Sequence, residues 1–104
     1  MTYQLRDIKG SVVVITGATT GIGAAAAKQL VELGCKVVLN ARNEAKLQEM
    51  VASLGADNAA YLAGDSSIPD VARAVAKKAI DTFGTIDCVV PNAGIGMYGS
   101  VLDY

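Results

Sequence analysis

The amino-acid sequence predicts a doubly wound α/β fold, in which a parallel sheet is covered by helices on both faces. Two observations support this prediction. Short apolar runs alternate with amphipathic stretches through the 104-residue chain, and such alternation is typical of parallel strands joined by right-handed crossover helices. The runs are also almost continuously apolar, which suits strands that are buried on both faces.

Four strands are expected, at residues 11–16, 36–41, 59–63 and 86–91. Each is short and rich in Val, Ile or Leu, except the third, which is Ala-rich and gives a weaker signal. The alternating order predicts a sheet with the strand order 3-2-1-4. A ligand crevice is then expected at the carboxyl ends of the first and fourth strands, where the order reverses.

Three helices are expected between these strands, at residues 22–33, 44–54 and 68–83. A glycine follows each helix end, where a left-handed residue is often needed: Gly34, Gly55 and Gly84. Asn43 is expected to cap the second helix. Ser67 and Asp70 have the spacing of a capping box at the start of the third.

Composition excludes several classes of protein. Apolar residues make up 52% of the chain and charged residues 18%, which argues against disorder. The net charge of −1 and the lack of a basic run argue against nucleic-acid binding. No apolar run approaches the roughly 18–20 residues of a membrane span, and no signal peptide is recognisable, so a cytoplasmic protein is expected.

The two cysteines, Cys35 and Cys88, do not have the spacing of metal ligands. The chain contains no histidine, which excludes a Cys/His zinc site. In the predicted strand order, the second and fourth strands flank the first and lie about 9–10 Å apart, too far for a disulfide. Two reduced, buried thiols are therefore expected.

Residues 16–23, Thr-Gly-Ala-Thr-Thr-Gly-Ile-Gly, follow the first expected strand and open the first helix. A helix N-terminus favours an anion, and glycines allow the tight turn and the close approach of a pyrophosphate. The spacing differs from the common Gly-x-Gly-x-x-Gly, and no Gly-Lys-Ser/Thr follows as in a nucleoside-triphosphate loop. The stretch predicts a dinucleotide site. The alternative is a strand–helix turn that binds no ligand.

The end of the second expected strand is basic. Dinucleotide folds usually place a carboxylate about 20 residues after the glycines, where it bonds the ribose hydroxyls. No carboxylate lies between Lys36 and Asn43, and Arg42 stands there instead. A guanidinium can grip a phosphate with paired donors, so NADP(H) is expected in preference to NAD(H). The alternative is a solvated arginine in a loop.

Two further loops follow strands at the same edge of the predicted sheet. Asp65, between Gly64 and Ser66, follows the third strand and can accept a hydrogen bond from an adenine amino group, or alternatively help to cap the next helix. Asn92-Ala93-Gly94 follows the fourth strand. Asn92 can tie neighbouring strand ends together, and the two small residues after it leave room for a ribose and a nicotinamide.

Together these loops resemble the N-terminal half of a short-chain dehydrogenase/reductase, over nearly the whole chain. The resemblance implies a Rossmann-type fold and assigns the cofactor contacts to the following residues: Gly17, Thr19, Thr20, Gly21, Ile22, Gly23, Asp65, Ser66, Asn92, Ala93 and Gly94. Family members with an arginine at the end of strand 2 tend to prefer NADP(H), in agreement with Arg42. The chain departs from the family at Pro91, where a second asparagine often stands.

The family's catalytic serine and its Tyr-x-x-x-Lys pair have no match in these 104 residues. In the family, the tyrosine transfers a proton while hydride moves to or from the nicotinamide, the lysine lowers the tyrosine pKa, and the serine polarises the carbonyl. No catalytic residue is therefore assigned. We expect one dinucleotide-binding domain over residues 1–104, truncated on its C-terminal side, which binds a cofactor without catalysing hydride transfer by itself.

Two functions are consistent with this reading. The first is the NADP(H)-binding portion of an oxidoreductase that interconverts an alcohol and a ketone. The second is a stand-alone module that binds a dinucleotide or pairs with a partner without catalysis. A methyltransferase-like nucleotide fold is disfavoured by the glycine and Asn-Ala-Gly motifs. Self-association is expected through the open edge of the fourth strand, or pairing with a missing C-terminal half.

Overall fold

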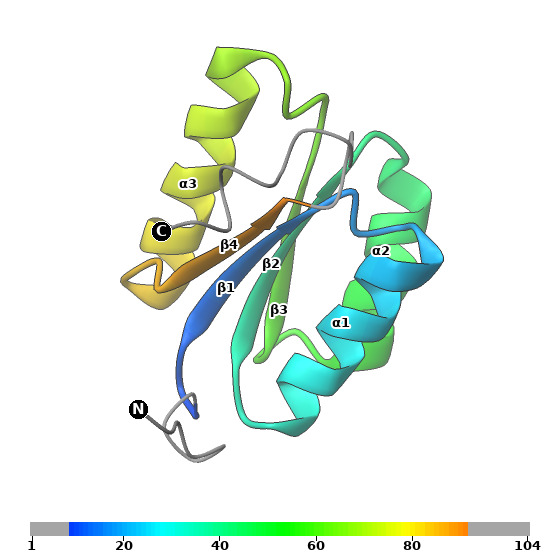
Figure 1. The fold of residues 1–104 in the computed structure, drawn as a ribbon, viewed down its shortest axis with the longest axis vertical. Coiled ribbons are helices and arrows are strands. Elements are labelled where there is room, and N and C mark those ends of the chain that lie inside the picture. Colours follow the sequence, from blue (N-terminus) through cyan, green and yellow to red (C-terminus); the bar gives the residue numbers. More distant parts are fainter. Residues whose placement is uncertain (1–8, 92–104) are drawn as a thin grey trace.

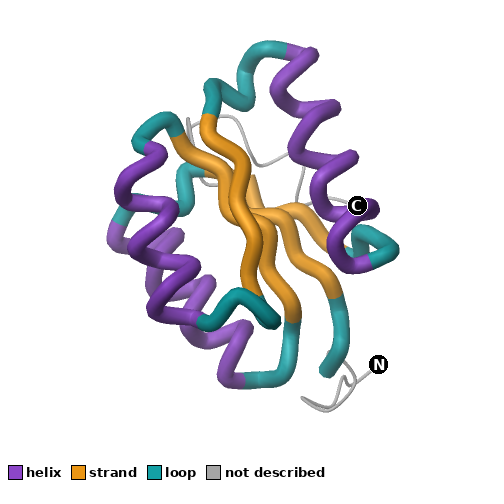
Figure 2. The backbone as a smooth tube through the Cα atoms, turned by 180° about the vertical axis from the view of Figure 1, so that it is seen from behind, coloured by secondary structure: helices purple, strands orange, loops and turns teal. Residues whose placement is uncertain are grey.

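The computed structural model describes residues 9–91, which form one parallel sheet between two layers of helices (Figure 1). In chain order, the elements are β1 (Val12–Thr16), α1 (Gly21–Glu32), β2 (Lys36–Ala41), α2 (Glu44–Leu54), β3 (Ala59–Ala63), α3 (Pro69–Phe83) and β4 (Cys88–Pro91). Helices α1 and α2 cover one face of the sheet, and α3 covers the other; the view from behind shows the twisted sheet between them (Figure 2).

The strand order is β3-β2-β1-β4, and every neighbouring pair is parallel. This confirms the predicted fold class and strand order. The register pairs Thr16 at the end of β1 with Asn40 in β2, and Ala41 at the end of β2 with Ala63 at the end of β3. The carboxyl ends of these three strands therefore meet at one edge of the sheet, and the loops that follow them lie side by side.

The core consists of two apolar clusters, one on each face of the sheet. The first packs alternate positions of β1 and β2 against α1 and α2: Val13, Ile15, Val37 and Leu39 with Ala27 and Leu47. The second packs the intervening positions against α3: Val12, Val14 and Val38 with Val75 and Ala79. Because successive side chains of a strand point to opposite faces, a strand covered on both faces is apolar at most of its consecutive positions. This explains the continuous apolar runs of the sequence.

Most of the local signals at helix ends are confirmed. The Asn43 side chain accepts a hydrogen bond from the N–H of Lys46 at 3.1 Å and caps α2. The glycines that follow the three helices have positive φ angles, as expected: Gly34, Gly55 and Gly84.

The predicted capping box at α3 is wrong. Ile68 is the N-cap of this helix, no side chain bonds to its first turn, and Pro69 stands at its start. The Ser67 hydroxyl instead donates to the Asp65 carboxylate at 2.7 Å. Ser67 therefore orders the loop before the helix, and proline at the first helical position leaves one fewer N–H in need of a cap.

Strand β4 begins at Cys88, two residues after the expected start. Asp87 precedes it and meets β1 through its side chain as well as its backbone: the N–H of Val12 donates to Asp87 Oδ2 at 2.8 Å, and the N–H of Asp87 donates to the Val12 carbonyl at 2.9 Å. The Asp87 carboxylate thus accepts a hydrogen bond from the first residue of β1, one position before the parallel pairing of β1 with β4 begins.

Both cysteines are expected to be buried, but one of them is exposed. Cys35 is buried, and burial raises the pKa of its thiol, but Cys88 is exposed. The reason is the position of β4, which pairs only with β1 in the described part of the sheet. An apolar composition alone does not distinguish such a strand from an interior one.

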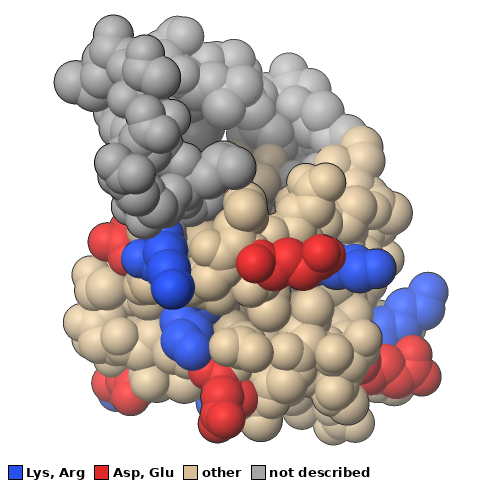
Figure 3. All heavy atoms as spheres, turned by 90° about the horizontal axis from the view of Figure 1, so that it is seen from below, with Lys and Arg blue, Asp and Glu red and all other residues tan. Residues whose placement is uncertain are grey.

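Basic and acidic side chains of the described residues are interspersed on the face seen in Figure 3. None of the helices in residues 9–91 has the length and apolar character that a bilayer crossing requires.

Candidate cofactor site

The loops at the carboxyl ends of β1, β2 and β3 enclose a hollow of about 280 Å³. The structure brings five of the predicted site residues together around it: Gly17, Thr19, Arg42, Asp65 and Ser66. It is completed by Asn40, Ala41, Asn43 and Gly64. Residues far apart in the sequence therefore converge at the carboxyl edge of the sheet, but on the side of β2 and β3, and not between β1 and β4 where the crevice is expected.

The turn between β1 and α1 is fixed by backbone hydrogen bonds. Gly17 has φ of 64°, a left-handed conformation that favours glycine. The N–H of Ala18 donates to the carbonyl of Asn40 at 3.0 Å, which fastens the turn to β2. The N–H of Thr20 donates to the carbonyl of Gly17 at 3.2 Å. The turn is thus a rigid support for the start of the helix.

Thr20 is the N-cap of α1. Its Oγ1 accepts from the N–H of Gly23 at 3.1 Å, and its hydroxyl donates to the Gly17 carbonyl at 3.0 Å. The N–H of Ala24 donates to the Thr20 carbonyl at 2.8 Å. Within residues 9–91, the N–H groups of Gly21 and Ile22 have no acceptor. These two donors stand at the positive end of the helix dipole, where an anion is favoured.

The space at Gly21 is open. Apart from its chain neighbours and the backbone of its own helix, a Cβ added there would meet no atom of residues 9–91 within 4 Å, and the φ angle of Gly21 is not positive. Neither the backbone conformation nor the packing of the described residues therefore requires glycine at this position. A glycine that leaves open space at a helix N-terminus is what the close approach of a phosphate requires. The cradle fits the pyrophosphate of a dinucleotide.

Arg42 and Asp65 face each other across the hollow. Arg42 follows the end of β2, and Asp65 follows the end of β3 by two residues. Arg42 Nη2 lies 3.8 Å from Asp65 Oδ2. The arginine side chain is 83% exposed and that of the aspartate 36%. The two groups form a loose ion pair, which leaves most of the guanidinium in solvent.

The other carboxylate oxygen of Asp65 is held by the loop. Oδ1 accepts from the Ser67 hydroxyl at 2.7 Å and from the Ser67 N–H at 2.9 Å. These bonds, first that from the hydroxyl and then that from the N–H, hold the pKa of Asp65 below its ordinary value; partial burial opposes them, and Arg42 adds a smaller lowering. Asp65 is therefore a charged, oriented carboxylate. It orders the loop and does not cap α3.

Asn40 is a site residue that sequence reasoning missed. It is the buried polar residue of the core, with 1% of its surface exposed. Its Nδ2 donates to the carbonyl of Leu62 at 2.9 Å and to that of Gly64 at 3.2 Å. The backbone carbonyl of Asn40 also accepts the hydrogen bond from the N–H of Ala18. Asn40 therefore connects the three loops of the site. The available signal was a single amide at the end of the apolar run 37–41.

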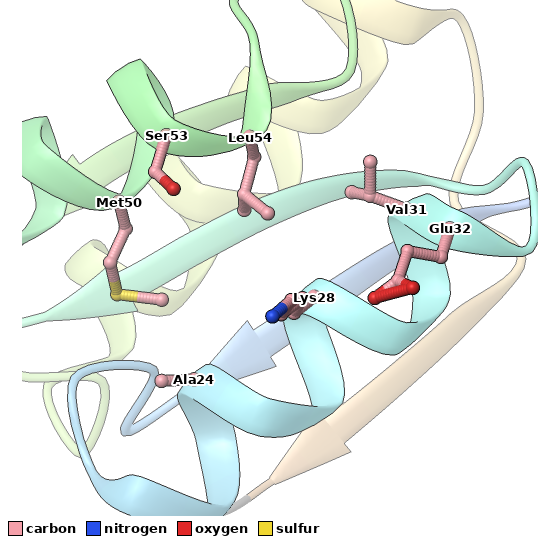
Figure 4. A pocket seen from close by; sticks show the side chains of 7 residues that line it. All are labelled: Ala24, Lys28, Val31, Glu32, Met50, Ser53 and Leu54. Carbon is pink, nitrogen blue, oxygen red and sulfur yellow. The ribbon is translucent and has the colours of Figure 1, made fainter.

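Some predicted residues lie elsewhere. Those in the first turn of α1 do not line the hollow: Thr20, Gly21, Ile22 and Gly23. Asn92, Ala93 and Gly94 lie outside the described residues. A different hollow of about 370 Å³ lies between α1 and α2 (Figure 4). It is lined by residues such as Lys28, Met50 and Leu54 and by no predicted site residue.

A parallel sheet of this strand order, with a glycine turn and a helix N-terminus at the carboxyl end of its central strand, defines a Rossmann-type dinucleotide-binding protein. The sequence matches the model of the short chain dehydrogenase family over residues 11–104, and the chain belongs to this family. The family uses NAD(H) or NADP(H) as cofactors.

Relatives agree with this assignment. An uncharacterized oxidoreductase of Thermotoga maritima is 41% identical over 98 residues, which cover 91% of this chain and 38% of the relative. A crystal structure of a glucose/ribitol dehydrogenase of the family from Brucella melitensis has a TM-score of 0.80 and 36% identity, over 84% of this chain and 37% of its own. The 3-ketoacyl-(acyl-carrier-protein) reductase of Brucella melitensis, complexed with NADH, has a TM-score of 0.75 and 33% identity, over 79% and 33%.

The chain thus spans less than half the length of the relatives that it matches and corresponds to their N-terminal portion.

Proposed function

We propose that residues 1–104 form one cofactor-binding domain, which is the N-terminal part of an NADP(H)-dependent oxidoreductase that interconverts an alcohol and a ketone. The named relatives, a sugar or polyol dehydrogenase and a ketoacyl reductase, support this class of reaction. In this proposal, the groups that transfer protons belong to residues other than these 104. The proposed location is the cytoplasm.

The open cradle at Gly21 is the observation that carries the proposal. The N–H groups of Gly21 and Ile22 are placed to donate to a pyrophosphate, and the Thr20 cap keeps the first turn of α1 in position. When bound, the nicotinamide supplies or takes up the hydride. The chain's own part is to bind the phosphates and to orient the adenosine end. The proposed contacts are Gly17, Thr19, Thr20, Gly21, Ile22, Gly23, Arg42, Asp65, Ser66, Asn92, Ala93 and Gly94.

The preference for NADP(H) rests on the end of β2. A carboxylate at this point would bond the ribose hydroxyls of NAD(H) and repel a 2′-phosphate. Here Asn40 and Ala41 are buried and Arg42 is exposed, so the first group available to the ribose is a guanidinium. Its pair with Asp65 is longer than a hydrogen bond, which leaves Arg42 able to turn toward a phosphate.

The cofactor preference is tested with the variant Arg42→Ala. We expect the affinity for NADPH to fall about 10-fold or more, because hydrogen bonds to charged groups contribute about 1.5–3 kcal/mol. The affinity for NADH should change less than about 2-fold, since NADH has no 2′-phosphate and the exposed guanidinium of Arg42 interacts only weakly with the rest of the cofactor. Fluorescence titration of both cofactors measures the two constants.

The matched control is Arg73→Ala, which removes the same charge from an exposed arginine that pairs with Asp70 on α3. This variant should leave the ratio of the two affinities unchanged. If Arg42→Ala also leaves the ratio unchanged, Arg42 does not bind the 2′-phosphate and the proposed preference is wrong.

We further propose that the chain associates through the side of β4 that pairs with no strand among residues 9–91, either with a second copy or with the remainder of its protein. The exposed side chains Cys88 and Val89 on this strand support the proposal, since open strand edges recruit partners. Sedimentation should show association that increases with concentration. A monomer at high concentration would contradict it.

A further inference from the structure

We infer that Asp65 weakens the preference for a 2′-phosphorylated nucleotide, because its carboxylate competes with the 2′-phosphate for the guanidinium of Arg42. This inference rests on the proposed phosphate-binding role of Arg42. It adds a role in cofactor selectivity to the contact with adenine that the family resemblance implies for Asp65.

The two oxygens of the Asp65 carboxylate have different surroundings. Oδ1 is held by the hydroxyl and the N–H of Ser67, so the carboxylate plane is fixed relative to the loop. Oδ2 is the oxygen that faces Arg42, at 3.8 Å from Nη2. The acid is therefore the fixed partner of the pair.

Arg42 is the movable partner. Its side chain is mostly in solvent, and the distance to Asp65 exceeds hydrogen-bond range. Asp65 therefore does not hold the guanidinium in one orientation, as it would if it prepared Arg42 for a ligand. It acts as a nearby negative charge that attracts the same cation. The bonds from Ser67 keep the pKa of Asp65 low, so this charge is present at neutral pH.

A 2′-phosphate brings about −1.5 to −2 charges to the same place. To bind Arg42, the phosphate must attract the guanidinium away from Asp65, and it is also repelled by the negative charge of the nearby carboxylate. Both effects oppose binding of the phosphorylated nucleotide and leave a nucleotide without this phosphate unaffected. Removing the charge of Asp65 should thus raise the selectivity for the 2′-phosphate.

The experiment compares the binding of adenosine 2′,5′-bisphosphate and 5′-AMP to the full chain by calorimetry. The two probes differ only in the 2′-phosphate, so any adenine contact that Asp65 makes cancels in the ratio of their affinities. Asp65→Asn keeps the size of the side chain and an oxygen for Ser67. We expect the ratio to rise about 3-fold, as fits an exposed charge pair, and the rise to shrink at high salt.

Asp81→Asn is the control. It removes the same charge near the far end of α3, where Asp81 pairs with Lys77, and should leave the ratio unchanged. The double variant Arg42→Ala, Asp65→Asn completes a cycle. Competition for Arg42 requires the effect of Asp65→Asn to be smaller in the absence of the arginine. An equal effect in both backgrounds would overturn the inference.

The outcomes separate this inference from the proposed function. If Arg42→Ala lowers the ratio but Asp65→Asn leaves it unchanged or lowers it, the competition is refuted and the role of Arg42 stands. If Arg42→Ala has no effect on the ratio, the proposed preference itself fails. Thermal unfolding of each variant checks that the fold is retained.

Discussion

Replacing Gly21 with alanine is expected to weaken NADPH binding about 30-fold or more and to leave the stability of the fold unchanged or slightly higher. The added Cβ meets no atom of the rest of the described structure within 4 Å, and the φ angle of Gly21 is not positive. Alanine is also favoured over glycine in helices by up to about 1 kcal/mol. The methyl group would instead occupy the space in front of the two available N–H groups of α1. Losing about 2 kcal/mol of charged hydrogen bonding corresponds to about 30-fold.

Gly84→Ala is the matched control, with the opposite result expected. Gly84 also has open space around it, but its φ is 90° and it caps the C-terminus of α3. An alanine there should lower the free energy of unfolding by about 1–2 kcal/mol, since the left-handed conformation is unfavourable for a residue with a Cβ. Its NADPH affinity should be unchanged. Urea unfolding and fluorescence titration give the two quantities for both variants. An unaltered affinity in Gly21→Ala would show that the pyrophosphate does not lie at the start of α1.

The fold was predictable because its strands carry an unambiguous local signal. Both β1 and β2 are buried from two sides, so their apolar runs are continuous, and the glycine after each helix marks where that helix ends. The two wrong predictions, the cap of α3 and the burial of Cys88, both depend on which groups come together in the folded chain. Ser67 had the correct spacing to cap α3, but its hydroxyl donates to the carboxylate of Asp65 instead. The exposure of Cys88 depends on the place of β4 in the sheet, which local composition does not report.

The site was predictable where a residue type was unexpected for its position. Arg42 stands where a carboxylate is usual, and three glycines lie within residues 17–23. The pairing of Arg42 with Asp65 needed the parallel register of β2 and β3, which places two loops side by side although they are 23 residues apart in the sequence. The importance of Asn40 was hidden for the same reason, because its acceptors, the carbonyls of Leu62 and Gly64, belong to β3 and to the loop after it.

Replacing Asn40 with leucine is expected to lower the free energy of unfolding by about 2–4 kcal/mol, because two partly buried carbonyls at the carboxyl end of β3 lose their donor. Leucine keeps the branching at Cγ and creates no cavity, so the loss reports the missing hydrogen bonds together with the strain of fitting a larger side chain. For a domain with a total stability near 5 kcal/mol, this is a large fraction. Urea unfolding of the variant measures the change.

Asn43→Ala provides the comparison for stability, because it removes an exposed side chain whose hydrogen bond caps α2 and should cost about 1 kcal/mol. If Asn40→Leu costs no more than Asn43→Ala, the two carbonyls find other donors and Asn40 is not the centre of the site. If it costs the larger amount, cofactor affinity should fall as well, because Gly64 directly precedes Asp65. The amide that stabilises the strand ends would then also fix the carboxylate that faces Arg42.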